Sequence, residues 1–263
     1  MKKVVLITGA SRGLGNLLAN HLAKHGYQVY GGVRSTYEKK KDLFIPLILD
    51  LSNENDMSAC VDTIMREEGR IDIVIHNAGL LYAGAPDTFT MEETRYLFEV
   101  NVFGPIRLTQ LILPYMRIQK HGRIVFISSI RGIESHVYRG LYSSTKAAIE
   151  AIAFDWAVSL TPWDIKISLI EPGPLSTNPS VIEGSHFDQK SNPYPPIQDF
   201  KLAWQSPEEV MPIIGEILDN PTPNFRYQTN SFTQARVGSH LKDITGQTWL
   251  EEQRRWFDES TKQ

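Results

Sequence analysis

Three polar side chains in the middle of the chain have types and spacings that suit proton transfer. Tyr142 and Lys146 are four residues apart (146 − 142), so on a helix they lie on one face, one turn from each other. An ammonium group beside a phenol stabilises the phenolate and lowers a tyrosine pKa from its usual value of ~10, which makes tyrosine a general acid or base near neutral pH. Ser129 ends an expected strand nearby and can hold a substrate oxygen. A tyrosine and a lysine at this spacing also occur as an ordinary surface pair of a helix, and the pair alone leaves both interpretations open.

A second group of residues, Thr8-Gly9-Ala10-Ser11-Arg12-Gly13-Leu14-Gly15, lies between the first expected strand and the first expected helix. A tight glycine turn lets the backbone approach a pyrophosphate closely, and the N-terminus of the helix offers free N–H groups and a positive dipole end. The spacing is Gly-x-x-x-Gly-x-Gly, not the Gly-x-Gly-x-x-Gly of longer dehydrogenases. In this position the glycines favour a nucleotide site over a purely structural turn.

The end of the second expected strand indicates which nicotinamide cofactor binds. An acidic side chain there binds the ribose 2′-hydroxyl of NAD, whereas an arginine accommodates the 2′-phosphate of NADP. Residues 29–35 contain no carboxylate, and Arg34 lies among them. Arg12, in the glycine turn, can add a second cation. The sequence therefore favours NADP and makes NAD the weaker candidate; the alternative is that both arginines are surface residues.

Short apolar runs alternate with helical patterns along the chain. The expected strands are Val4–Thr8, Gln28–Val33, Ile45–Leu49, Ile71–His76, Arg123–Ser128, Lys166–Ile170 and a seventh at Asn224–Thr229. The expected helices are Leu14–His25, Glu54–Glu67, Met91–Gln119 and Tyr142–Leu160. Continuously apolar strands are typical of a sheet covered on both faces. The alternation predicts an α/β fold, a doubly wound, Rossmann-type parallel sheet of about seven strands.

The composition changes after Glu171, where Pro, Ser and Asn become frequent and periodicity is lost. Loops of this length commonly serve as lids. We therefore expect a single domain over residues 1–263 with a substrate-side flap over about residues 175–207. The aromatic residues of the flap could line an apolar pocket or pack into the core; they are Phe187, Tyr194, Phe200 and Trp204.

The bulk composition excludes several classes of protein. A net charge of −3 gives no electrostatic reason to expect nucleic acid or an anionic membrane as partner. The single cysteine, Cys60, excludes an internal disulfide, fits a reducing compartment and has the setting of a buried structural thiol. The apolar run at the start is too short for a signal peptide, and no stretch approaches the ~18 apolar residues of a membrane span. We expect a cytoplasmic protein without a metal site, because none of the seven histidines pairs at ligand spacing with another ligand cluster.

Together these motifs resemble the short-chain dehydrogenase/reductase family over about the first 180 residues. The matching pieces are Thr8-Gly9-x-x-x-Gly13-x-Gly15, Asp50-Leu51, Asn77-Ala78-Gly79, Asn101, Ser129, Tyr142-x-x-x-Lys146 and Pro172-Gly173-x-x-x-Thr177. The segments 166–174, 26–30 and 224–228 are similar to the branch that contains 17β-hydroxysteroid and retinol dehydrogenases.

The resemblance implies an NADP(H)-dependent oxidoreductase that interconverts a carbonyl and an alcohol. Tyr142 would donate or accept the proton, and Lys146 would lower its pKa and bind the nicotinamide ribose. Asn101 would hold the water of a proton relay. Ser129 would orient the substrate carbonyl; it is chosen over Ser128 because it lies thirteen residues before Tyr142 (142 − 129), as in family members.

The resemblance also implies a cofactor site built from several segments. Asp50 would meet the adenine amino group, Asn77 would support the sheet near the cofactor, and Thr177 would touch the carboxamide. The implied cofactor-binding set is Gly9, Ser11, Arg12, Gly13, Leu14, Gly15, Arg34, Asp50, Leu51, Asn77, Ala78, Gly79, Tyr142, Lys146, Pro172, Gly173 and Thr177. The family usually has Asn-Asn-Ala-Gly, so His76 is a departure, expected as a tolerated neighbour of the cofactor pocket.

The branch suggests a bulky apolar substrate, steroid- or retinoid-like, or another small molecule. Two alternatives stand beside it: a catalytically silent nucleotide-binding regulator, and an enoyl reductase or epimerase on the same fold. The helix Tyr142–Leu160 is apolar nearly all round, so we expect it to be buried on every side, against the sheet and against a second subunit. This predicts a homodimer or homotetramer.

Overall fold

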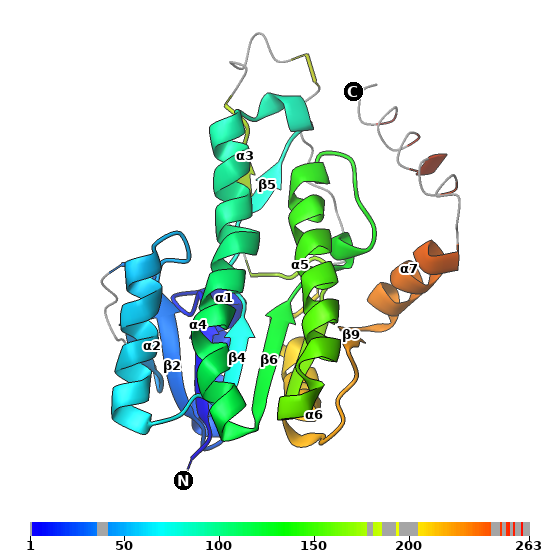
Figure 1. Cartoon of the computed structure of the whole chain (residues 1–263). Coiled ribbons are helices and arrows are strands. Elements are labelled where there is room, and N and C mark those ends of the chain that lie inside the picture. Colours follow the sequence, from blue (N-terminus) through cyan, green and yellow to red (C-terminus); the bar gives the residue numbers. More distant parts are fainter. Residues whose placement is uncertain are drawn as a thin grey trace.

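The centre of the chain is a seven-stranded parallel sheet in the order β3-β2-β1-β4-β6-β7-β9 (Figure 1). The computed structural model describes residues 2–35, 42–177, 181–185, 193–194 and 205–242, with Thr248, Glu251, Glu252, Arg255 and Glu259. The strands of this sheet are β1 (Val4–Thr8), β2 (Gln28–Val33), β3 (Ile45–Ile48), β4 (Ile73–His76), β6 (Gly122–Ile127), β7 (Ile165–Glu171) and β9 (Arg226–Gln228). The predicted doubly wound fold is confirmed, with strand ends that differ from the predicted ones by up to two residues.

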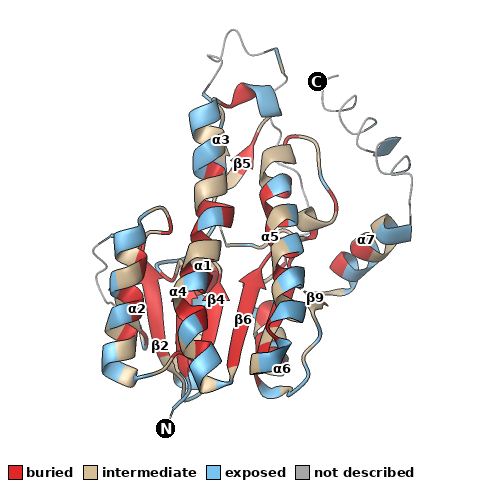
Figure 2. Ribbon diagram, viewed as in Figure 1, coloured by how far each residue is buried: buried red, intermediate tan, exposed pale blue. Residues whose placement is uncertain are grey.

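Helices cover both faces of the sheet (Figure 1). On one face α2 (Glu54–Glu68), α4 (Gly104–Gln119) and α5 (Gly140–Ser159) share an apolar cluster with the strands. On the other face α1 (Gly13–Lys24) and α6 (Met211–Asp219) form a second cluster. The central strands β1, β4 and β6 are therefore buried at every position (Figure 2), as their continuously apolar sequences predict.

Cys60 lies in the first of these clusters and is 2% exposed. Burial raises the pKa of its thiol to about 12, so the thiolate that a nucleophile needs is disfavoured. The prediction of a buried structural thiol is confirmed.

The helix predicted over Met91–Gln119 is divided in three. An α-helix, α3 (Met91–Phe98), begins with a capping box between Thr90 and Glu93, and a π-helical segment, Glu99–Phe103, joins it to α4. A π-helical turn holds more residues than an α-helical turn, so it rotates the side chains that follow, and such segments are frequent at functional sites. Asn101 lies in this segment.

Two strands and two α-helices of the described residues were not predicted, and α6, which precedes β9, is one of them. A short parallel pair, β5 (Leu81–Ala83) with β8 (Val181–Glu183), joins the segment after β4 to the flap. An additional helix, α7 (Ser231–Lys242), follows β9. Of the aromatic flap residues, Tyr194 donates a hydrogen bond to Asp87 at 2.9 Å, and Phe187, Phe200 and Trp204 lie outside the described residues.

The single chain buries α5 on the side of the sheet, and the second subunit expected on its other side stays a prediction. Ile149 and Ala153 pack into the core, but Phe154 and Val158 are each 60% exposed. On this outer face the ring of Phe154 meets the ring of Phe225 edge-on, with centroids 5.7 Å apart, and most of its surface stays exposed. No helix of the described residues is sufficiently long and apolar to cross a membrane.

His76 ends β4 and is 4% exposed. Its Nε2 lies 2.9 Å from Oγ1 of Thr109, and its ring stacks on Phe126 with centroids 4.6 Å apart. Burial lowers the pKa of His76 from 6.5 to about 3, so the folded protein holds this side chain neutral.

This burial predicts a loss of stability in mild acid. Below pH 6.5 His76 is protonated in the unfolded chain but stays neutral in the folded chain. The free energy of unfolding therefore falls as the pH falls towards about 3. At a pH near 5 the loss from this residue is about 2 kcal/mol. His76→Asn should remove that part of the fall, measured as the free energy of unfolding in urea near pH 7 and near pH 5. His25→Asn, at an exposed position, is the control, and an unchanged pH dependence in His76→Asn would contradict the prediction.

Candidate active site

Ser129 and Tyr142 come together at the carboxyl edge of the sheet. Ser129 follows β6 and caps a short 3-10 turn, Ile130–Gly132, by accepting a hydrogen bond from the backbone N–H of Arg131 at 3.2 Å. Its hydroxyl also lies 3.4 Å from the carbonyl of Pro172, which follows β7. Tyr142 lies in the first turn of α5 and forms a side-chain hydrogen bond with Ser129. The two hydroxyl groups can therefore meet one substrate oxygen.

Tyr142 is half-buried in this site. Burial raises its pKa to about 12, while the hydrogen bond with Ser129 and the positive charges of Arg131 and Arg139 act to lower it. Neither arginine was among the predicted site residues, because an arginine between two candidate site residues has no distinguishing pattern. Arg131 is held in place by Glu134, with 2.8 Å between Nη1 and Oε1.

Lys146 lies one turn beyond Tyr142 on α5 and is 8% exposed. Its Nζ donates a hydrogen bond to the carbonyl of Ile127 at 2.8 Å and lies 5.7 Å from the centroid of the Tyr142 ring. Burial lowers the pKa of Lys146 to about 8. The predicted pairing of these two side chains on one helix face is thus present in the structure.

Asn101 links the segment after β4 to α5. Its Oδ1 accepts from the N–H of Leu80 at 2.7 Å, and its Nδ2 donates to the carbonyl of Leu80 at 2.9 Å. The same Nδ2 donates to Oγ1 of Thr145 at 3.1 Å, directly beside Lys146. The π-helical segment turns the amide towards these partners, so Asn101 belongs to the same cluster as Tyr142 and Lys146.

The glycine turn packs tightly against the end of β4. A Cβ atom on Gly15 would lie 2.3 Å from the carbonyl oxygen of Gly9 and 2.4 Å from Nδ2 of Asn77, so only glycine fits there. Gly9 and Gly13 have φ angles of 71° and 58°, which favour glycine. The N-terminal turn of α1 is thereby held beside Asn77.

Thr8 holds the two segments together and was not among the predicted site residues. Its Oγ1 accepts hydrogen bonds from the N–H groups of Asn77 at 3.0 Å and Ala78 at 2.9 Å. Asn77 in turn donates from Nδ2 to the carbonyls of Thr8 at 3.0 Å and Gly9 at 3.3 Å. A threonine before a glycine turn reads as an ordinary strand residue in the sequence, which is why its role was missed.

The N-terminus of α1 fits a dinucleotide. Its N-cap residue, Arg12, is extended, its side chain makes no capping hydrogen bond, and the first turn carries no acidic residue. Such an end offers N–H groups and a positive dipole to a pyrophosphate. The N–H of Ala10 donates to the carbonyl of Gly32 at 2.9 Å, which places the turn beside the end of β2, where Arg34 is exposed.

The remaining predicted cofactor-binding residues differ in the contacts that they make. A Cβ atom on Gly13 would lie 3.5 Å from Cβ of Thr177, and one on Gly79 would lie 3.9 Å from Nζ of Lys146, so both segments reach the site. Asp50 accepts from the N–H of Ser52 at 2.8 Å. The side chains of Leu14 and Leu51 pack in the apolar clusters of the two sheet faces. Ser11 is exposed, Pro172 is buried, and Gly173 packs near Thr233.

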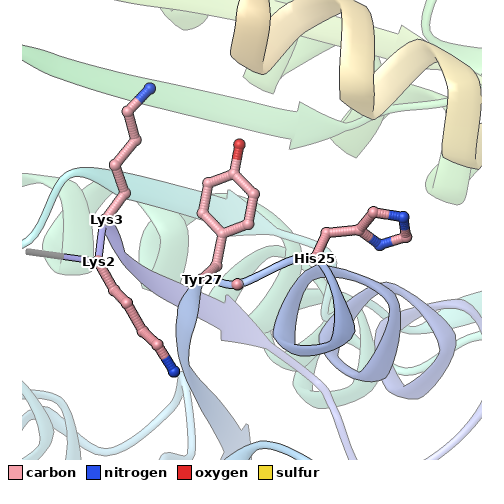
Figure 3. A pocket seen from close by; sticks show the side chains of 5 residues that line it. Lys2, Lys3, His25 and Tyr27 are labelled. Atoms are coloured by element: carbon pink, nitrogen blue, oxygen red, sulfur yellow. The ribbon is translucent and has the colours of Figure 1, made fainter.

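A surface pocket of about 550 Å³ lies at the other edge of the sheet (Figure 3). It is lined by Lys2, Lys3, His25, Gly26 and Tyr27. These residues precede β1 or connect α1 to β2, so they lie at the amino ends of the strands. The pocket is therefore separate from the cluster of Ser129, Tyr142 and Lys146.

The sequence matches a known family model and several characterised relatives. The model of the short chain dehydrogenases matches residues 3–183. A 3-ketodihydrosphingosine reductase of Bacteroides thetaiotaomicron is 37% identical over 175 residues, which cover 66% of this chain and 65% of the relative. Bovine retinol dehydrogenase 8 is 27% identical over 94% of this chain and 88% of its own. Human 17-beta-hydroxysteroid dehydrogenase type 1 is 29% identical over 95% of this chain and 84% of its own.

Solved structures have the same fold. A short-chain dehydrogenase of Streptomyces avermitilis, 27% identical, superposes with a TM-score of 0.81 over 97% of this chain and 98% of its own. A short-chain dehydrogenase of Burkholderia cenocepacia in complex with NADP is 21% identical, with a TM-score of 0.77 over 96% of this chain and 97% of its own. At that identity, the second likeness concerns the fold alone.

Proposed function

Because the chain belongs to the short-chain dehydrogenase/reductase family, in the branch of the retinol and 17β-hydroxysteroid dehydrogenases, we propose that it interconverts a carbonyl and an alcohol with NADP(H) as cofactor. The observation that carries the proposal is the cluster at the carboxyl edge, where the hydroxyls of Ser129 and Tyr142 are hydrogen-bonded and Lys146 lies beneath the tyrosine ring. The set is complete for proton transfer to a bound oxygen.

The proposed chemistry divides between the cofactor and the chain. The nicotinamide, when bound, supplies the hydride to the carbonyl carbon. Ser129 orients the carbonyl oxygen, and Tyr142 donates its proton to that oxygen. With a pKa of about 12 in the cofactor-free chain, Tyr142 keeps its proton at neutral pH, which is the state that reduction requires.

Lys146 stabilises the phenolate that forms when the proton leaves and binds the nicotinamide ribose. Asn101 fixes the segment at Leu80 and holds the water that returns a proton to the site. In oxidation of an alcohol the same groups act in reverse, with Tyr142 as the general base.

The proposed NADP site rests on two arginines and on the contacts that the other predicted residues can make with the cofactor. The N-terminus of α1 would hold the pyrophosphate, and Arg34 and Arg12 would bind the 2′-phosphate. Asp50 would meet the adenine amino group, and Thr177 would touch the carboxamide. Arg34 and the lack of a carboxylate in residues 29–35 support NADP over NAD. For the substrate, the named activities of the relatives favour a bulky apolar molecule of steroid or retinoid type.

The proposed assembly is a homodimer or homotetramer, in the cytoplasm. It is supported by the exposed apolar face of α5, which includes Ala147, Ala151, Phe154 and Val158. Exposed apolar residues recurring along one helix face are typical of a surface that a partner covers. A second copy of the chain supplies the same face.

Tyr142→Phe should lower turnover about 10²-fold or more, because it removes the proton donor and leaves the ring in place. NADPH affinity should remain nearly unchanged. The measurement is the rate of NADPH oxidation with a panel of ketones and aldehydes, and Tyr115→Phe on α4 is the matched control. Parental activity in Tyr142→Phe would show that this mechanism is wrong.

Arg34→Ala should weaken NADPH binding about tenfold to a hundredfold, because a charge-assisted contact contributes about 1.5–3 kcal/mol. NADH has no 2′-phosphate, so its affinity should hardly change. Calorimetric titration of both cofactors into the parent and the variant gives the comparison. Lys24→Ala removes an exposed positive charge elsewhere and serves as the control. An equal loss for both cofactors contradicts the assignment.

Phe154→Glu should convert the oligomer to a monomer, because a carboxylate would be buried in an apolar interface. Light scattering at micromolar concentration measures the mass. Leu43→Glu, at another exposed apolar position, should keep the parental mass. A monomeric parent protein would overturn the proposed assembly.

A further inference from the structure

Two buried carboxylates lie behind the candidate active site and have no role in the proposed reaction. Glu150 follows Lys146 by one turn of α5 and is 3% exposed. Glu171 ends β7 and is fully buried. Buried carboxylates are expensive unless they are hydrogen-bonded or paired with cations, so their partners indicate what they do.

Each oxygen of Glu150 has a close partner. Oγ of Ser128 donates to Oε1 at 2.5 Å, and Nη1 of Arg226 donates to Oε2 at 2.5 Å. Ser128 directly follows Ile127, whose carbonyl accepts from the ammonium of Lys146. The ammonium and the carboxylate are therefore held by consecutive residues at the end of one strand.

The backbone between the two catalytic hydroxyls closes over this carboxylate. A Cβ atom on Gly132 would lie 2.0 Å from Oε1 of Glu150 and 3.1 Å from Oγ of Ser128, so a side chain at this position would displace the carboxylate. Gly132 belongs to the turn that Ser129 caps. Glu150 thus packs against the same turn that positions Ser129.

The negative charges of Glu150 and Glu171 are balanced only when Lys146 is counted together with Arg226. From β9, Nη1 of Arg226 also donates to Glu171 of β7 at 2.5 Å, so one guanidinium serves two carboxylates. Gln228 donates to the other oxygen of Glu171 at 2.8 Å and adds no charge. From α5 itself, Lys146 supplies the second cation. Among these described groups, two negative charges therefore face two positive ones.

We propose that Glu150 is a positioning residue for the proposed reaction, whose carboxylate keeps the Lys146 ammonium charged beneath Tyr142. The inference rests on the proposed function, because the charge of Lys146 matters through the phenolate it stabilises. Burial alone lowers the pKa of Lys146, and the negative charge of Glu150 raises it, leaving it at about 8. Burial raises the pKa of Glu150 and the charge of Glu171 adds to this, whereas the hydrogen bond from Ser128 and the charge of Arg226 act to lower it.

The first test measures Lys146 directly in the cofactor-free protein. Competitive labelling with acetic anhydride across neutral and alkaline pH, followed by mass spectrometry of the peptide that contains Lys146, gives the pKa of its amine. In Glu150→Gln, which keeps the shape and removes the charge, that pKa should fall by about one unit. In Glu150→Asp, which restores the charge, it should return towards the parental value. An unchanged Lys146 titration in folded Glu150→Gln protein overturns the proposal.

Glu171→Gln is the matched control. Glu171→Gln removes the charge of the other carboxylate that Arg226 contacts, so a structural role alone predicts similar losses of stability in the two variants. The pKa of Lys146 should stay unchanged in Glu171→Gln. An equal shift in Glu171→Gln would overturn the specific role of Glu150. If Glu150→Gln fails to fold, Ser128→Ala takes its place. It removes one hydrogen bond to Glu150 and so makes the ionised form of Glu150 less stable. The pKa of Lys146 should then also fall, but by less.

The second test uses activity. The alkaline limb of the pH profile of kcat/KM for reduction should move about one unit lower in Glu150→Gln and stay in place in Glu171→Gln. A parent protein that reduces no carbonyl would refute the proposed function, whereas the labelling result would still decide the influence of Glu150 on Lys146. An active Glu150→Gln with the parental profile would refute this inference alone.

Discussion

Parallel strands carry their carboxyl ends to the same edge of a sheet, and in this chain seven strands share that edge. The register of their backbone hydrogen bonds places Thr8 opposite Gly32, and His76 opposite Phe126. The residues that follow each strand are thereby brought near one another, and the side chains of Thr8 and Asn77 then tie two of these segments together. The glycine turn, Asn77 and Ser129 all depend on this constraint, because each lies one or two residues after a strand. Burial of both sheet faces makes the arrangement rigid, since every shift would separate packed apolar side chains.

The sequence contains enough to predict the sheet and the pairing of Tyr142 with Lys146, because apolar strands and a four-residue helical spacing are local patterns. It does not contain a local sign of what Thr8 does, since its two acceptor contacts come from residues about seventy positions away. The π-helical segment at Asn101 was likewise hidden inside one continuous helical pattern. The pair β5–β8 involves three residues per strand and pairs segments a hundred residues apart. Long-range pairings of short segments leave no periodicity to detect.

Burial moves the two central groups of the site in opposite directions. It raises the pKa of Tyr142 and lowers that of Lys146, because low-dielectric surroundings disfavour the charged form of each. Nearby charges oppose both effects: Arg131 and Arg139 act on the tyrosine, and Glu150 acts on the lysine. A site that excludes water thus needs surrounding charges to keep its groups usable. The residues that carry these charges are not part of the sequence motifs, so the motifs alone do not reveal them.

The part of the chain beyond the family match reaches back into the site. The match ends at residue 183, and the alignment with the Bacteroides thetaiotaomicron reductase covers a similar share of the chain. Yet Arg226 lies in β9, after that boundary, and donates to both buried carboxylates behind Lys146. Because β9 pairs with β7 at Glu171, the segment beyond residue 183 is connected to the residues behind Lys146. Sequence changes at Arg226 can therefore alter the charge balance around Glu150 and Lys146.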